Sequence, residues 1–131
     1  LEETDLLIIS KSDGSGGYDS KYITGAELTN VTIDTKTISY TVVLADANKL
    51  IEINNASANA LGVPLNSTDA FPIGTQILVT QLGAGQTTIT PVSGVTLRSS
   101  GGKLKIAAQY GMATLIKRAT DEWYVAGDLT T

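Results

Sequence analysis

The acidic side chains are the residues of this 131-residue sequence that could most readily do chemistry, because the chain contains no histidine and no cysteine. The usual general base near neutral pH and the Ser-His-Asp arrangement are therefore missing, as are the common zinc-ligand sets. A pair of carboxylates, as used in glycoside hydrolysis, is what remains. The candidates lie in turns and at strand ends: Asp46, Glu52, Asp69, Asp121, Glu122 and Asp128. Because aspartates in turns mostly bind backbone groups or water, we expect no catalytic residue, no metal site, no cofactor, and a protein that is not an enzyme.

Two loops look like ligand-binding loops but lack part of the necessary sequence. Asp13 and Asp19 flank small polar residues that could supply oxygens to calcium, yet the alternating acids and the closing Glu of an EF-hand loop are missing. Residues 83–86, GAGQ, resemble a phosphate cradle, but neither a helix start nor a Lys-Ser/Thr pair follows them. We interpret the first loop as a plain turn and the second as a hairpin turn.

Trp123 and Tyr124 form an aromatic pair whose ring faces suit stacking on sugars, and Tyr110 is a third candidate of this kind. Trp123, however, alternates with Val125, as residues on the core side of a strand do. We therefore favour a core position for Trp123 and an interface position for Tyr124. Contact of Trp123, Tyr124 and Tyr110 with a glycan is the alternative.

Glu52 stands in the otherwise apolar segment KLIEIN, residues 49–54. One interpretation is a charge on an edge strand that prevents aggregation, and the other is a partner for a cation across a subunit contact. We favour the first. Strand alternation places Leu50 and Glu52 on one face of this segment and Ile51 and Ile53 on the other.

Short β-branched segments separated by Gly, Asn and Ser turns supply the strands that must position these side chains. Residues 35–44 alternate as one strand, with Ile38, Tyr40 and Val42 on the same side. Residues 75–82, TQILVTQL, are the clearest strand. Residues 55–65, NASANALGVPL, follow, and Pro64 favours an edge strand or a strand end there. Further strands are expected at residues 87–90, 95–99, 103–110, 112–118 and 122–126, with an ATDE turn joining the last two.

Roughly eight to ten short strands and no amphipathic helix of ordinary length predict an all-β protein. Antiparallel pairing is the usual arrangement for such strands. We therefore expect an antiparallel β-sandwich or a jelly-roll-like domain over residues 35–131. A small module of a hairpin plus a helical turn precedes it over residues 1–34.

The expected hairpin module consists of two strands around a glycine-rich loop. Residues 5–11 and 18–23 are the strands, and residues 12–17, SDGSGG, are the loop between them. Thr24 and Glu27 have the spacing of a capping box, which predicts a short helical turn. A hairpin of this size is too small to be stable alone.

The charge and the apolar content of the sequence limit the kinds of partner that the protein can bind. The net charge is −4 and the Lys and Arg residues are scattered, so no basic stripe predicts binding to nucleic acid. No apolar run approaches the roughly 18 residues of a membrane span, so we expect no membrane insertion. Several strands are apolar on both faces, and another copy of the chain is the simplest cover for the surplus.

Residues 71–129 carry the motif FPIGTQILVTQLGAGQTTI, then GVTL, QY and the ending DEWYVAGDL. This segment resembles the C-terminal modules of tailed-bacteriophage virion proteins such as tail fibres, baseplate appendages and head fibres or head decorations. The resemblance implies a non-enzymatic structural protein on the surface of the phage particle, on the tail or the head. It also implies a homotrimer in contact with other virion proteins. A tip module that binds host surface glycan for attachment is the alternative.

The first 28 residues resemble a second module of phage tail and appendage proteins, which has an apolar strand, a polar turn, a Tyr-containing strand and a T-G-x-E-L ending. The resemblance implies a particle-docking role for its apolar and aromatic side chains. Those side chains are Leu6, Leu7, Ile8, Tyr18, Tyr22 and Leu28. Because the sequence begins with Leu1, we also expect a segment of a longer or processed polypeptide.

Overall fold

The computed structural model describes residues 6–12, 18–24 and 30–131, and the chain divides into two compact units, Leu1–Val31 and Thr32–Thr131. In the first unit, β1 (Leu6–Ser12) pairs antiparallel with β2 (Tyr18–Thr24). The two predicted hairpin strands are therefore confirmed. The helical turn expected after Thr24, and Asp13 of the calcium-like loop, lie outside the described residues.

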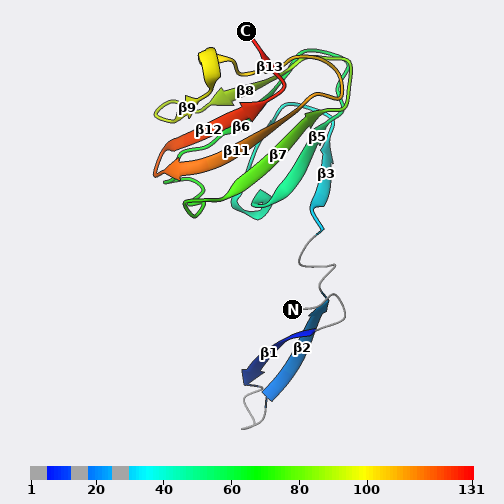
Figure 1. The fold of residues 1–131 in the computed structure, drawn as a ribbon, viewed down its shortest axis with the longest axis vertical. Helices are drawn as coiled ribbons and strands as arrows, with labels where there is room; N and C mark the ends of the chain where they lie inside the picture. Colours follow the sequence, from blue (N-terminus) through cyan, green and yellow to red (C-terminus); the bar gives the residue numbers. More distant parts are fainter. Residues whose placement is uncertain (1–5, 13–17, 25–29) are drawn as a thin grey trace. The chain divides into compact units, whose positions relative to one another are not determined.

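The second unit is built from two β-sheets, drawn in Figure 1. The six-stranded sheet has the order β3-β5-β7-β11-β12-β9, and the five-stranded sheet has the order β13-β10-β8-β6-β4. The strands are β3 (Thr32–Lys36), β4 (Tyr40–Thr41), β5 (Lys49–Ile53), β6 (Asn59–Val63), β7 (Gln76–Gln81), β8 (Thr87–Pro91), β9 (Thr96–Arg98), β10 (Lys105–Ile106), β11 (Met112–Ala119), β12 (Glu122–Gly127) and β13 (Leu129–Thr130).

The prediction of an all-β protein is confirmed, and the helical content described is two single 3-10 turns, η1 (Leu44–Asp46) and η2 (Ser100–Gly102). Within the described ranges, no helix has the length and apolar character that a membrane span needs. The expected domain boundary after residue 34 falls inside β3. The two units instead divide before Thr32, so that the whole of β3 belongs to the second unit.

The first six strands of the second unit form stacked coils in which the chain alternates between the two sheets. β3, β5 and β7 pair in parallel in one sheet, and β4, β6 and β8 pair in parallel in the other. Equivalent positions of successive coils lie side by side, so that Ile33 pairs with Leu50 and Leu50 with Leu78. The antiparallel arrangement expected for the whole domain is therefore wrong for this part, and also for β9, which pairs in parallel with β12. Antiparallel pairing is found between β7 and β11, β11 and β12, β8 and β10, and β10 and β13.

The single strand expected at residues 35–44 is broken in two, because the chain crosses there from one sheet to the other. β3 ends at Lys36 and β4 begins at Tyr40 in the opposite sheet. Ile38, which was expected to face the core with Tyr40 and Val42, lies in this crossing and is 70% exposed. Val42 is fully buried, as expected.

Residues 83–86 were expected to form a hairpin turn, and this prediction is wrong, because they carry the chain from β7 in one sheet to β8 in the other. The segment stacks on the crossing of the preceding coil, where the N–H groups of Gly83 and Gly85 donate to the carbonyl oxygens of Ile53 and Asn55 at 3.0 and 2.9 Å. A Cβ on Gly85 would lie 2.0 Å from the Ser57 carbonyl oxygen. Glycine is therefore required for this close approach of two backbones.

One hydrophobic core lies between the sheets, and both sheets contribute to it. Ile51 and Ile53 of β5 point inward, and Leu50 and Glu52 point outward, as predicted. Trp123 is 1% exposed and packs edge-to-face against Phe71, with ring centroids 5.4 Å apart. The core position predicted for Trp123 is therefore confirmed.

Candidate functional site

The outer face of the six-stranded sheet carries apolar side chains from five of its strands. Ile33, Leu50 and Leu78 lie in one row across β3, β5 and β7, while Ile116 and Tyr124 pair across β11 and β12. The set Ile33, Leu50, Leu78, Met112, Ile116 and Tyr124 is called the outer-face stripe below. All six are exposed or half-buried, although their strand neighbours Ile51, Val79, Leu115 and Trp123 are buried in the core.

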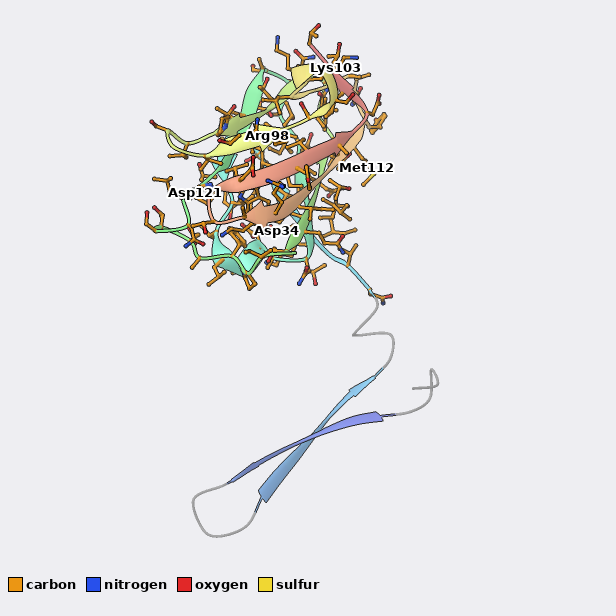
Figure 2. The ribbon with its side chains drawn as sticks, turned by 60° about the vertical axis from the view of Figure 1, so that its left-hand side comes forward. Asp34, Arg98, Lys103, Met112 and Asp121 are labelled. Carbon is orange, nitrogen blue, oxygen red and sulfur yellow. The ribbon has the colours of Figure 1, made fainter. Side chains whose placement is uncertain are left out.

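Charges of both signs border the outer-face stripe. Glu52 lies in the row that contains Thr35, Thr80 and Met112, and its Oε1 accepts a hydrogen bond from the Thr35 hydroxyl at 2.7 Å. Arg98 pairs with Tyr124 at the other end of the strands. Figure 2 labels Met112 and Arg98, which mark these two ends. β5 lies between β3 and β7, so the favoured interpretation of Glu52 as an edge-strand charge is wrong.

The basic end is organised around Glu122. Arg98 Nε donates to Glu122 Oε1 at 2.6 Å, and Arg118 NH1 donates to Glu122 Oε2. These two guanidinium groups, Arg98 first, hold the pKa of Glu122 below its ordinary value. Arg118 Nε also donates to the Tyr124 hydroxyl at 2.9 Å, and the guanidinium lies 5.3 Å from the centre of the Tyr124 ring. Glu122 therefore remains ionised and anchors Arg118, and Arg118 orients Tyr124.

The other candidate carboxylates bind backbone and side-chain groups of their own fold. The buried Asp46 accepts hydrogen bonds from the Tyr40 hydroxyl at 2.6 Å and from the Val43 N–H at 2.9 Å. Burial, and then Asp46, raise the pKa of Tyr40. Asp69 accepts from the Leu44 N–H at 2.9 Å and Asp121 from the Asn66 N–H at 2.7 Å.

These carboxylates tie loops in place, and the contacts described give no carboxylate pair facing a common hollow. Asp128 is exposed beside β13. No group of three or more His, Cys, Asp or Glu in the described part of the chain is arranged to hold a metal ion. What these side chains do chemically here is accept hydrogen bonds.

Lys117 is a functional candidate that the sequence analysis missed. It belongs to β11, is 2% exposed, and its Nζ donates to Asn66 Oδ1 at 2.5 Å and to the Phe71 carbonyl oxygen at 2.8 Å. Removal from water lowers the pKa of this amine. The available signal was its place two residues after Leu115, on the inward face of the strand.

The aromatic candidates do not come together. Trp123 faces the core, whereas Tyr124 is 48% exposed on the outer face of the same strand. Tyr110 is exposed in the turn that follows β10, where it has a positive φ of 69°, and the long strand expected at residues 103–110 is reduced to Lys105–Ile106. A sugar platform made of Trp123 and Tyr124 is therefore not formed.

The candidate docking residues of the first unit lie in the hairpin. Leu6, Leu7 and Ile8 belong to β1, and Tyr18 and Tyr22 belong to β2. Register places Ile8 opposite Tyr22. Leu28 lies outside the described residues.

Two shallow hollows mark the surface of the second unit. One is bordered by Ser39, Tyr40, Thr41, Ala60, Gly62, Thr90, Pro91 and Val92. The other is bordered by Ser100, Lys103, Val125, Ala126, Gly127 and Leu129. Neither includes Trp123, Tyr124 or Tyr110, so neither gathers the aromatic side chains expected of a sugar site.

The outer-face stripe is thus apolar, with an acidic residue at one end and arginines at the other. No protein-family model matches the chain, and no curated protein matches it.

Proposed function

We propose that this chain is a non-enzymatic structural module of a bacteriophage particle that multimerises through the outer-face stripe. The exposure of Ile33, Ile116 and Tyr124 on one sheet face is the observation that carries the proposal. Burying a fully exposed aliphatic side chain contributes about 1.5–3 kcal/mol, and these side chains, already about half-buried, would contribute a fraction of that. A contiguous apolar face is typical of a protein contact.

A second copy of the chain is the occupant that this face fits best. Glu52 lies at one end of the stripe, and Arg98 and Arg118 lie at the other. When a symmetry-related copy is placed against the stripe, its arginines can approach Glu52 while the apolar centres meet. The face is therefore complementary to itself in charge and in polarity.

The particle as the place of action, on its tail or head, rests on the resemblance of residues 71–129 to phage virion modules. The resemblance implies a homotrimer, whereas face-to-face pairing of the outer-face stripe gives a twofold dimer, so the mass measured by sedimentation decides between the two assemblies. Docking to other virion proteins through the β1–β2 hairpin is part of the same proposal, with Leu6, Leu7 and Ile8 on one strand and Tyr18 and Tyr22 on the other.

Sedimentation of the full chain tests the multimer. Ile116→Lys places a charge in the middle of the stripe and is expected to convert the multimer to monomer. Val92→Lys is the matched control, because Val92 is also 40% exposed but follows β8 of the other sheet. A wild-type chain that sediments as a monomer at the highest usable concentration would refute self-association.

Particle binding tests the location. Labelled full chain is mixed with phage particles that lack it, and binding is expected to fall when residues 1–31 are removed. Normal binding of the truncated chain would refute docking through the hairpin.

A receptor-binding tip is the second candidate, and the orientation of Tyr124 favours it. The Tyr124 ring is half-exposed, Arg118 fixes its hydroxyl, and the carboxylate of Glu122 lies alongside. An exposed aromatic face with polar neighbours suits a sugar. Binding of the chain to host cells that is lost in Tyr124→Ala, with the multimer intact, would establish this function instead.

A further inference from the structure

The contact between Lys117 and Asn66 brings together the two reactants of an amide-forming reaction. These residues are 51 positions apart, one on β11 and the other in the loop after β6, and Lys117 Nζ lies 2.5 Å from Asn66 Oδ1. We propose that Lys117 and Asn66 form an internal isopeptide cross-link spontaneously, without an enzyme.

The reacting atoms are within reach of each other. A carbonyl C=O bond is about 1.23 Å long, so Lys117 Nζ lies no more than about 3.7 Å from the carboxamide carbon of Asn66. Productive contacts between reacting atoms are roughly 3–3.5 Å. Lys117 Nζ is also held from a second direction by the Phe71 carbonyl oxygen at 2.8 Å. The amine is therefore fixed beside the carboxamide, and attack requires the carboxamide of Asn66 to turn its face toward Nζ.

The surroundings favour the nucleophilic form of the amine. Lys117 is 2% exposed, and the edge-to-face pair of Phe71 and Trp123 belongs to the same core. Burial lowers the pKa of the amine, which increases the uncharged fraction that carries the free electron pair. Lys117 is thus shielded from water, whereas the Asn66 side chain is half-buried at the edge of the core.

Asp121 is the carboxylate that holds the loop carrying the carboxamide. Its Oδ1 accepts the backbone N–H of Asn66 at 2.7 Å, and its charge acts on Lys117. Figure 2 shows Asp121 at the end of the β11–β12 hairpin. The same residue therefore contacts the loop that carries the carboxamide and lies in the field of the amine.

The step is balanced without an oxidant, a reductant or a further reactant. The electron pair of Lys117 Nζ attacks Cγ of Asn66, and a C–N bond forms. In the tetrahedral intermediate both nitrogens are bonded to Cγ, and a proton passes from Nζ to Nδ2 of Asn66. The Cγ–Nδ2 bond then breaks, and Nδ2 leaves as ammonia. A secondary amide joins the two side chains.

The full chain, purified in its folded state, tests the proposal by intact mass. The expected mass is below that of the sequence by one ammonia, about 17 Da. Trypsin is expected to leave Lys117 uncut, because its amine is acylated, and to yield residues 50–98 joined to residues 106–118 as one branched peptide. Incubation at about pH 9 gives a slow reaction time to finish, because more of the amine is then uncharged.

Two results would overturn the proposal. One is a folded chain that keeps its full mass after this incubation and is cut after Lys117. The other is a loss of about 17 Da with no branched peptide. That result would mean that an asparagine has cyclised onto its own backbone, which also releases ammonia.

Variants separate the chemistry from a merely structural contact. Lys117→Arg keeps a charged donor but has no amine of suitable nucleophilicity, so its full mass is expected. Asp121→Ala removes the acceptor of the Asn66 N–H and is expected to slow the mass loss by about 10-fold or more, because the carboxamide is then less well placed. Asp69→Ala is the control, because Asp69 also accepts a backbone N–H but from Leu44. Cross-linking at the wild-type rate in Asp121→Ala would refute the positioning role of Asp121.

Discussion

The two faces of the β11–β12 hairpin place the same kinds of side chain in opposite surroundings. Lys117 and Arg118 are neighbours in sequence, yet Lys117 is buried against carbonyl oxygens and Arg118 is exposed beside Glu122 and Tyr124. The pKa of Lys117 is lowered by burial, whereas the pKa of Arg118 is raised by its hydrogen bonds, first to Glu122. Residue type alone therefore does not tell which cation stabilises the fold and which is available to a partner.

Trp123 and Tyr124 are also neighbours in sequence, one buried and one exposed. Replacing them is expected to give the largest difference in the free energy of unfolding. Trp123→Ala removes a fully packed side chain and should lower the free energy of unfolding by about 3–5 kcal/mol. Tyr124→Ala should change it by about 0.5 kcal/mol or less, since surface changes rarely do more. Urea denaturation followed by circular dichroism measures both. Equal losses in the two variants would show that the inward and outward assignments are wrong.

The cations give the next largest difference. In the chain without the cross-link, Lys117→Met keeps the side-chain length but leaves the Phe71 carbonyl and the Asn66 side chain without their donor, at a cost of about 1–3 kcal/mol. Arg118→Met should cost less than about 1 kcal/mol, because exposed ion pairs contribute little. The same urea measurement compares them. A Lys117→Met variant as stable as Arg118→Met would mean that the buried contacts do not stabilise the fold.

The smallest effect concerns pH. The arginines lower the pKa of Glu122 in the folded chain, so its contribution to stability is complete above the ordinary value of 4.5 and is lost as the pH falls through the lower folded value. The difference in urea midpoint between the wild type and Glu122→Gln should therefore shrink below about pH 4.5. High salt should reduce the same difference at neutral pH. If the difference in urea midpoint stays constant down to about pH 2, the ion pairs of Glu122 with the two arginines do not contribute to stability.

Local alternation in the sequence predicted the β11–β12 hairpin well, because its two strands are neighbours in the chain. Trp123 and Val125 point inward and Tyr124 outward, as their spacing indicates. The stacked coils were not predictable in this way. Alternation shows which face of a strand is apolar, but not which strand lies beside it. It therefore predicts a continuous strand across Ile38 and a hairpin turn at Gly83, where the chain in fact crosses between the sheets.

The candidate site was predictable only in part. The exposed position of Tyr124 follows from the core position of Trp123. Lys117 was missed because a charged residue is usually exposed, and its partners Asn66 and Phe71 come from a loop about 50 residues earlier. Glu52 was placed correctly on the outward face, but its neighbours β3 and β7 could not be inferred from its own segment.

The stacking of Gly83 and Gly85 on the preceding crossing makes each coil a unit that repeats along an axis. Since a parallel coil pairs through its backbone with the coil before it and the coil after it, each contact involves nearest neighbours only. A duplicated segment that kept such glycines would add length without disturbing the antiparallel strands at the end of the domain. The height of the module is therefore a property that evolution or design can change by whole coils.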